Sequence, residues 1–268
     1  MTARSLEAVA PDAAPVARDT RDTATRDAAT QDAATRDAAT TLHPAAAARD
    51  AFPLAIRSVT KRWRKDLPLV LDDVDLVLEQ GTLTWVGGRN GAGKTTLLRI
   101  AAGLIEPEQG RAEVWGVSVR ENRARYQTLV SFLPAGDRGL YARLTVRRQL
   151  EFWARISMVA PARVRQSVDR AIDEFDLGEL ADRRVDRMSM GQRQRLRIAM
   201  TFLPDPETVL LDEPLTSLDD EGAAVLMRAV RGLLERDGVV LWCSPSGERL
   251  ELSVDARWLI DQGRLAPA

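Results

Sequence analysis

The chain has 268 residues, with 38 basic and 39 acidic side chains and a formal net charge of −1. This balance excludes bulk electrostatic attraction to nucleic acid or anionic lipid, so no nucleic-acid partner is expected. The single cysteine, Cys243, excludes an intrachain disulfide and fits a reducing compartment. No apolar run reaches the roughly 18 residues of a membrane-spanning helix, and no secretory signal is visible at the start. We expect a cytoplasmic protein.

The first 50 residues differ in composition from the rest. Residues 21–40 are four near-identical pentads of the type Arg-Asp-Ala-Ala-Thr. A period of five matches neither a helix nor a strand, and large apolar side chains are nearly absent. Such a segment cannot bury enough surface to offset its ordering entropy. We predict a disordered low-complexity tail over residues 1–50. The alternative is a partner-binding helix, which the alanine content favours.

Order is expected to begin near Phe52, with short strands at residues 54–59, 70–71 and 74–78 and a turn at residues 80–81. Between the first two strands, Trp63 is flanked by basic residues in the run Lys-Arg-Trp-Arg-Lys. An aromatic ring in this setting can stack on adenine. The alternative is a surface tryptophan that covers the edge of a sheet.

A phosphate-binding loop follows the apolar run at residues 83–86. The loop reads Gly88-Arg89-Asn90-Gly91-Ala92-Gly93-Lys94-Thr95-Thr96, which contains the pattern G-x-x-x-x-G-K-T. Glycines let the backbone wrap closely around phosphates at the positive end of a helix. Lys94 supplies positive charge to the β- and γ-phosphates, and Thr95 offers its hydroxyl to Mg²⁺. The loop predicts nucleotide binding.

The middle of the chain adds strands and a helical insertion. Residues 112–115 and 128–134 are typical of strands, and a loop follows at residues 135–139. Apolar spacing turns helical from Leu144 to Leu180, where Pro161 and Gly178 divide the pattern into short helices. This stretch predicts an inserted helical lobe.

Two further motifs carry chemistry. Ser189 and Gln192 have the spacing of a helix capping box, and the same helix start could hold a phosphate. The apolar strand at residues 208–211 ends in two carboxylates, of which Asp212 can hold Mg²⁺ and Glu213 can orient or deprotonate a water molecule. An acidic strand-to-loop turn is the alternative for this pair. Last come strands at residues 239–243 and 258–260.

Together these motifs resemble the ATP-binding cassette (ABC) ATPase domain over residues 52–265. The loop from Gly88 to Thr95 is similar to Walker A, residues 188–192 to the LSGGQ signature, and residues 209–213 to Walker B with its catalytic glutamate. Ser217-Leu218-Asp219 is similar to the D-loop. The combination is specific to the family, and the tail lies outside it.

The resemblance implies an α/β fold with a RecA-like P-loop NTPase core, an antiparallel β subdomain and an inserted α-helical subdomain at about residues 140–190. It implies ATP and Mg²⁺ as cofactors, with Lys94 and Glu213 as catalytic residues and Thr95 and Asp212 at the metal. A second ABC ATPase domain, identical or different, would bind head to tail. In that pairing the residues of the signature and D-loop would contact the partner's ATP; they are Ser189, Gly191, Gln192 and Asp219.

The resemblance also implies a membrane partner. A chain without a span of its own is similar to the ATPase subunit of a transporter whose permease is a separate transmembrane polypeptide. The chain would then sit on the inner face of the cell membrane through that permease. Residues 136–145 are most similar to the branch of the family that exports drugs, lipids or polysaccharides.

Three positions depart from the family. Ala135 stands where the Q-loop glutamine is expected, Met190 replaces the first signature glycine, and Pro245 stands at the switch histidine. The only histidine, His43, lies in the predicted tail. Removing one pre-organised donor commonly costs about 2.7–4 kcal/mol, so we expect hydrolysis to be slowed roughly 10-fold to 1000-fold.

Two functions compete on these observations. The first is a transporter ATPase that closes on ATP and is reset by hydrolysis, which the retained Glu213 favours. The second is an ATP-gated regulatory subunit, or the degenerate half of a heterodimer, which Ala135 and Pro245 favour. An ABC protein of DNA repair or translation is disfavoured, because those carry long coiled coils or two cassettes in one chain.

Overall fold

The computed structural model describes residues 52–136, 138–245 and 252–268. The chain divides near residue 41 into two units, and all the described residues belong to the second. The predicted tail at residues 1–50 lies outside the described residues, as do His43 and the central residue of the loop at 135–139.

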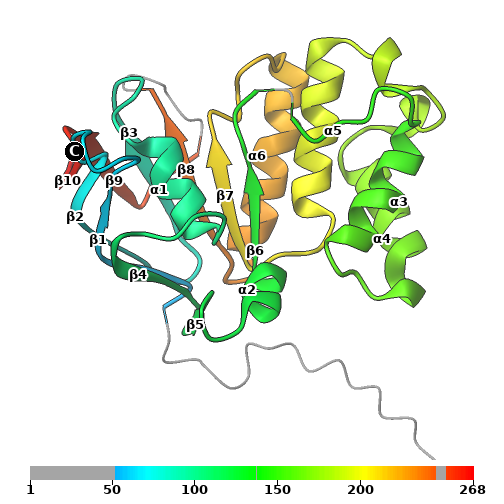
Figure 1. The fold of residues 1–268 in the computed structure, drawn as a ribbon. Coiled ribbons are helices and arrows are strands. Elements are labelled where there is room, and N and C mark those ends of the chain that lie inside the picture. The colour runs from blue at the N-terminus through cyan, green and yellow to red at the C-terminus, as the bar shows by residue number, and fades with distance from the viewer. Residues whose placement is uncertain (1–51, 137, 246–251) are drawn as a thin grey trace, which may run out of the picture. The chain divides into compact units, whose positions relative to one another are not determined.

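A six-stranded sheet forms the centre of the fold (Figure 1). Its order is β10-β9-β3-β8-β7-β6, and every neighbouring pair is parallel except β10 with β9. The strands are β3 (Leu83–Gly87), β6 (Val130–Leu133), β7 (Thr208–Asp212), β8 (Val239–Ser244), β9 (Ala256–Asp261) and β10 (Arg264–Pro267). Because the strands are parallel, the loops that follow β3, β6, β7 and β8 gather at one edge of the sheet.

A second, antiparallel sheet lies beside the central one, with the order β2-β1-β4-β5. Its strands are β1 (Leu54–Lys61), β2 (Leu71–Leu78), β4 (Gln109–Val114) and β5 (Val117–Ser118). The loop between β1 and β2 carries Trp63.

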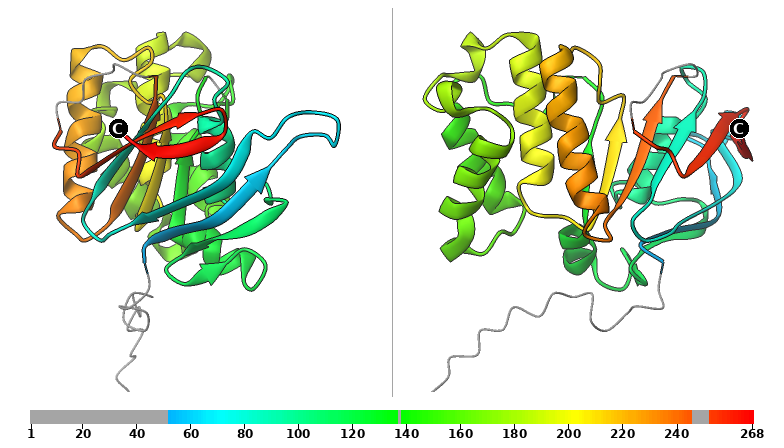
Figure 2. Two further views of the ribbon diagram at one scale, coloured as in Figure 1. Left: turned by 90° about the vertical axis from the view of Figure 1, so that its left-hand side faces the viewer. Right: turned by 180° about the vertical axis from the view of Figure 1, so that it is seen from behind.

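Helices cover both faces of the central sheet, as the view from behind in Figure 2 makes clear. On one side are α1 (Lys94–Ala101) and α2 (Arg123–Leu129), and on the other are α5 (Met190–Phe202) and α6 (Asp220–Leu234). Beyond α5 lie α3 (Val146–Ile156) and α4 (Val164–Glu174). Short 3₁₀ helices occupy Pro161–Arg163, Gly178–Leu180 and Val185–Arg187. Helical structure therefore fills the region where the insertion was predicted.

Alternating side chains divide the core into two hydrophobic clusters. Along β8, Val240 and Trp242 belong to the cluster that includes α3 to α6, whereas Leu241 and Cys243 belong to the cluster that includes α1 and the antiparallel sheet. Successive side chains of a strand point to opposite faces, so a strand that is covered on both faces reads as a continuous apolar run. The parallel core thus follows from the apolar composition of its strands.

Several predicted boundaries were wrong. Residues 71–78 form one strand rather than two, and Asp73 within it adopts a φ of 49°. Residues 128 and 129 belong to helix α2, so the following strand begins only at Val130. The last strand is longer than expected and pairs with β10, which was not predicted.

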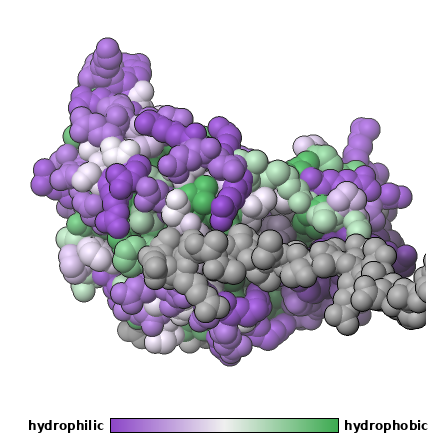
Figure 3. All heavy atoms as spheres, turned by 90° about the horizontal axis from the view of Figure 1, so that it is seen from below, coloured by the Kyte–Doolittle hydropathy of each residue, from purple (hydrophilic) through white to green (hydrophobic). Residues whose placement is uncertain are grey.

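None of the helices in the described ranges is both long and apolar enough to cross a membrane. Where grey atoms do not cover the face seen from below in Figure 3, hydrophobic side chains lie among many polar ones.

Candidate functional site

The predicted phosphate loop and the paired carboxylates meet at one edge of the central sheet. In the register of the strands, Gly87 at the end of β3 lies opposite Ser244 of β8, and Asp212 at the end of β7 lies opposite Cys243 of the same strand. Ligands of open α/β sheets bind outside the carboxyl ends of the strands. The topology therefore brings Walker A and Walker B together.

The phosphate loop leads directly into helix α1. Gly93 is the N-cap residue and adopts a φ of 117°, a conformation that side chains disfavour. A Cβ atom at Gly93 would lie 2.7 Å from the carbonyl oxygen of Val70. The glycine thus allows the loop to pack against the antiparallel sheet. The free N–H groups at the start of α1 are then available to an anion.

Lys94 is the first residue of α1, and its side chain folds back over the loop. The residue is 5% exposed, and its Nζ donates to the carbonyl oxygens of Gly88, at 2.7 Å, and Arg89, at 3.1 Å. Arg89, Asn90 and Gly91 are exposed at the tip of the loop. The ammonium group is therefore held beside backbone that is open to a ligand.

Thr95 and Asp212 form the direct contact between the two motifs. The Thr95 hydroxyl donates to Oδ2 of Asp212 at 2.8 Å. Oδ1 of Asp212 is buried and has no hydrogen-bond partner among the described residues. Burial raises the pKa of Asp212, while the Thr95 hydroxyl, the backbone N–H of Ala135 and the charge of Lys94 act in the opposite direction. A buried carboxylate oxygen without a partner is costly unless a cation or a donor satisfies it.

Glu213 follows at the end of β7 and has an unusual backbone. Its φ is 48°, and its N–H donates to the carbonyl oxygen of Cys243 at 2.8 Å. A positive φ at a residue other than glycine stores strain and persists only where the surroundings enforce it. The hydrogen bond to β8 thus fixes the strand end that carries the half-buried carboxylate.

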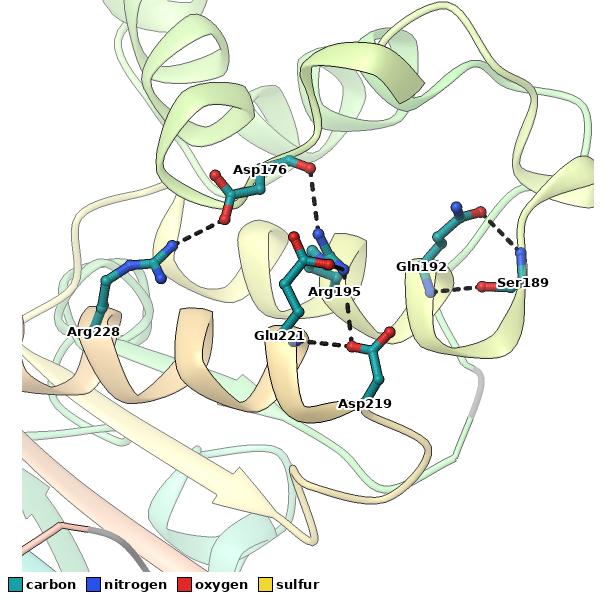
Figure 4. Close-up of polar contacts among 8 residues, drawn as sticks. Asp176, Ser189, Gln192, Arg195, Asp219, Glu221 and Arg228 are labelled. Carbon is teal, nitrogen blue, oxygen red and sulfur yellow. Dashed lines mark hydrogen bonds and ion pairs between the residues drawn. The ribbon is translucent and has the colours of Figure 1, made fainter.

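A second group of predicted residues lies around the start of α5 (Figure 4). Ser189 caps the helix, because its Oγ accepts from the Gln192 N–H at 3.2 Å and the Gln192 Oε1 accepts from the Ser189 N–H at 3.1 Å. The capping box is therefore present. Met190 is 56% exposed, and a Cβ at Gly191 would lie 3.3 Å from the Ser217 carbonyl oxygen. Signature and D-loop are neighbours.

Arg195 joins this group to the rest of the molecule. Its guanidinium donates to the backbone oxygen of Asp176 at 3.5 Å and pairs with Glu221 at 3.3 Å and Asp219 at 3.9 Å (Figure 4). Asp219 caps α6 by accepting from the Gly222 N–H at 2.8 Å. The predicted D-loop residue thus has a structural role in the folded chain, and its contact with nucleotide stays a prediction.

The three departures lie at the surface. Ala135, Met190 and Pro245 are exposed. Ser244, just before Pro245, is buried, and its Oγ accepts from the Trp85 indole at 2.8 Å. Trp63 is 49% exposed, with the Lys61 ammonium 5.8 Å from its ring centroid, and its contact with adenine stays a prediction.

Sequence reasoning missed a set of buried polar residues behind the site. Arg197 and Gln194 on α5 are 3% and 5% exposed and bond to each other at 2.6 Å. Their other partners lie 20 to 63 residues away in the chain. The one local signal was their position on a helix otherwise rich in buried apolar residues, where a polar side chain needs a partner.

Comparison with known proteins identifies the family of the chain. The profile of the ABC transporter family matches residues 71–216. NatA of Bacillus subtilis, an ABC transporter ATP-binding protein, is 30% identical over 75% of this chain and 82% of its own. DrrA3 of Streptomyces coeruleorubidus, a daunorubicin resistance ATP-binding protein, is 34% identical over 73% of this chain and 61% of its own. Relatives named for import and for export both occur.

The fold is also that of solved cassettes. A structure of an ATP-binding subunit of an ABC transporter superposes with a TM-score of 0.72, at 23% identity over 80% of this chain and 89% of its own. The chain therefore belongs to the ABC transporter family, as an ATP-binding subunit.

Proposed function

We propose that this chain binds MgATP at the edge formed by Walker A and Walker B and hydrolyses it slowly to drive a separate permease. The observation that carries this proposal is the contact of Thr95 with Asp212, beside the Lys94 ammonium and the Glu213 carboxylate. These are the groups that phosphoryl transfer in P-loop enzymes needs for binding phosphate, holding the metal and orienting water.

The residues present fit a magnesium ion. Mg²⁺ is usually held by one or two carboxylates together with substrate phosphates and water, rather than by a cage of protein ligands. Asp212 supplies one carboxylate, with a buried oxygen that lacks a partner among the described residues, and Thr95 supplies a hydroxyl. The described ranges hold no cluster of three or more His, Cys, Asp or Glu side chains that suits a metal. A bound Mg²⁺ would neutralise charge on the β- and γ-phosphates.

The protein groups have separate roles in this proposal. The N–H groups at the start of α1 and the Lys94 ammonium bind the phosphates. Glu213, fixed by its hydrogen bond to β8, orients the attacking water and accepts its proton. Ala135 and Pro245 offer no side-chain donor at the two positions where the resemblance implies one. We therefore expect a rate roughly 10-fold to 1000-fold below that of a complete site.

A second cassette would complete the site. The start of α5 presents backbone N–H groups beside the exposed Met190, where a partner's γ-phosphate could bind. Ser189 and Gln192 hold this turn in shape through the capping box. We infer that Gly191 contributes its backbone to the same contact, as the resemblance implies.

The permease has a candidate docking place in a cleft of about 640 Å³ between α1, β6 and α3. Exposed apolar side chains on its lining include Leu104, Ile156 and Met158, and Arg99 and Arg138 add positive charge. A groove of this kind suits an amphipathic helix with an acidic edge. Docking there would place the chain on the inner face of the membrane. The similarity of residues 136–145 to exporters and the name of DrrA3 support export.

The alternative function is ATP-gated binding without hydrolysis, which Ala135 and Pro245 favour. We would measure steady-state ATP hydrolysis by the purified chain, alone and with its permease, beside Glu213→Gln and Pro245→His. We expect slow turnover that Glu213→Gln abolishes, because the general base is lost. A wild-type chain that binds ATP but matches Glu213→Gln, while Pro245→His gains turnover, would establish the ATP-gated function instead.

A further inference from the structure

Arg197 is a buried arginine that bonds to a loop beside the proposed site. It lies on α5, is 3% exposed, and donates to the backbone oxygen of Pro134, to that of Arg138 at 3.2 Å, and to Oε1 of Gln194 at 2.6 Å. Removing a guanidinium from water costs several kcal/mol unless its donors are satisfied, and an apolar side chain would avoid that cost. Filling space in the core therefore does not explain why an arginine occupies position 197.

The loop that Arg197 holds borders the metal carboxylate. Residues 134–136 follow β6, the strand that pairs with β7. In that parallel pairing Leu133 lies opposite Leu211, so the backbone that follows β6 runs beside Asp212 at the end of β7. Ala135 has no side-chain amide, so only the placement of its backbone can influence the metal site.

The same loop borders the cleft. Pro134 and Arg138, whose carbonyl oxygens Arg197 binds, both line the cleft of about 640 Å³. An occupant of the cleft would therefore press on the residues that Arg197 fixes. The loop stands between the candidate docking place and Asp212.

Gln194, the hydrogen-bond partner of Arg197, contacts the loop that carries Glu213. Its Nε2 donates to the Pro214 oxygen at 2.9 Å, one residue after Glu213. The pair of Arg197 and Gln194 thus ties the loop after β6 to the loop after β7 from behind.

We propose that Arg197 is a positioning residue, which fixes the backbone of residues 134–136 against Asp212 where the side chain at 135 offers no donor. This inference rests on the proposed function, since it concerns the same magnesium site. A purely structural arginine would affect folding but not the dependence of ATP binding on Mg²⁺.

The test uses the full chain in a Glu213→Gln background, so that binding is measured at equilibrium. Binding of a fluorescent ATP analogue is titrated without Mg²⁺ and against increasing Mg²⁺, for the parent, Arg197→Met and Arg197→Lys. Arg170→Met is the control, because Arg170 donates to the Leu203 oxygen at 3.1 Å and pairs with Asp205 at 3.8 Å, and both partners lie outside the two loops of the site.

We expect Arg197→Met to raise the Mg²⁺ concentration for half-maximal binding about 10-fold, the usual effect of removing a group that orients a metal ligand. Affinity without Mg²⁺ should change less than about 2-fold, since the phosphate loop is untouched. Arg197→Lys should give a smaller shift, because it keeps the charge but loses the planar fork. Arg170→Met should shift neither value.

Two results would overturn the inference. One is an unchanged Mg²⁺ dependence in Arg197→Met. The other is a loss of affinity with and without Mg²⁺ in parallel with the melting temperature, which Arg197→Lys does not relieve. Should Arg197→Met fail to fold, an unshifted Arg197→Lys would overturn it. A wild-type chain that binds MgATP but does not hydrolyse it refutes the proposed hydrolysis alone. A Glu213→Gln parent that binds no ATP refutes both proposals.

Discussion

At the scale of single residues, Asp212 combines its proposed role as a metal ligand with burial that opposes its charge. Its carboxylate is buried, with Oδ1 lacking a hydrogen-bond partner among the described residues. Burial raises its pKa, which means that the folded protein disfavours the charge that a cation needs. Residues selected for binding are commonly a local source of instability in the free protein.

We therefore predict that Asp212→Asn stabilises the free protein while it weakens metal binding. Removing the buried charge should add about 1 kcal/mol to the free energy of unfolding, which corresponds to roughly 2–4 °C in melting temperature for a domain of this size. The Mg²⁺ concentration for half-maximal ATP binding should rise at least about 10-fold. Thermal unfolding and Mg²⁺ titrations measure the two effects.

The control for this prediction is Asp72→Asn at the surface. Asp72 pairs with Arg264 at 2.7 Å, so its substitution should give no gain in stability. If the nucleotide-free Asp212→Asn protein melts at a lower temperature than the parent, the buried carboxylate does not destabilise the folded protein.

At the scale of elements, β3 is built around one close contact. Trp85 and Gly87 point to the same side of the strand, and a Cβ at Gly87 would lie 2.0 Å from the Trp85 ring. The ring also donates to Ser244, so it links β3 to β8 just before the phosphate loop. Position 87 must therefore be a glycine, because the Trp85 ring occupies the space that any larger side chain would need.

Gly87→Ala should lower the free energy of unfolding by about 1–3 kcal/mol through overpacking. Trp85→Phe removes the ring atoms that would clash, so the double variant should be destabilised less than the sum of the singles, by at least about 1 kcal/mol. Urea denaturation of the four proteins measures this coupling.

Gly178→Ala serves as the control for the strand, because a Cβ there meets nothing within 4 Å. It should change stability by less than about 0.5 kcal/mol. Additive effects of Gly87→Ala and Trp85→Phe would mean that the alanine is accommodated by a shift of the backbone rather than opposed by the ring.

Elements also differ in how far the sequence predicts them. The phosphate loop and the strand before it were predictable, because a local pattern determines both. Helix α2 was not, since seven mostly polar residues carry no apolar stripe, although Asn122 caps it by accepting from the Arg125 N–H at 3.0 Å. The contacts of Arg197 could not be predicted, because its loop partners are 59 and 63 residues distant in sequence.

At the scale of the whole molecule, the proposed site is shared between chains. The proposed phosphate ligands follow β3 and the proposed metal ligand Asp212 ends β7, whereas the signature lies at the start of α5, which packs in the same hydrophobic cluster as the helical lobe. A net charge of −1 gives a second copy little long-range attraction or repulsion. Association should therefore depend on local contacts with the nucleotide.

Substitutions of Ser189 can test the contact with a partner's nucleotide without disturbing the folding of the chain. Ser189→Asp keeps an N-cap of equal quality, and a negative charge suits a helix start, so the stability of the free protein should stay within about 0.5 kcal/mol of the parent. The added carboxylate would face the γ-phosphate of a bound partner, and like charges at an interface cost several kcal/mol. In a Glu213→Gln background, ATP-dependent dimer formation should weaken at least about 10-fold, as measured by light scattering during gel filtration.

The control is Ser189→Asn, which places a neutral cap at the same position and should dimerise like the parent. Equal dimerisation of the Asp and Asn variants would mean that Ser189 only caps α5 and that the partner's ATP binds elsewhere.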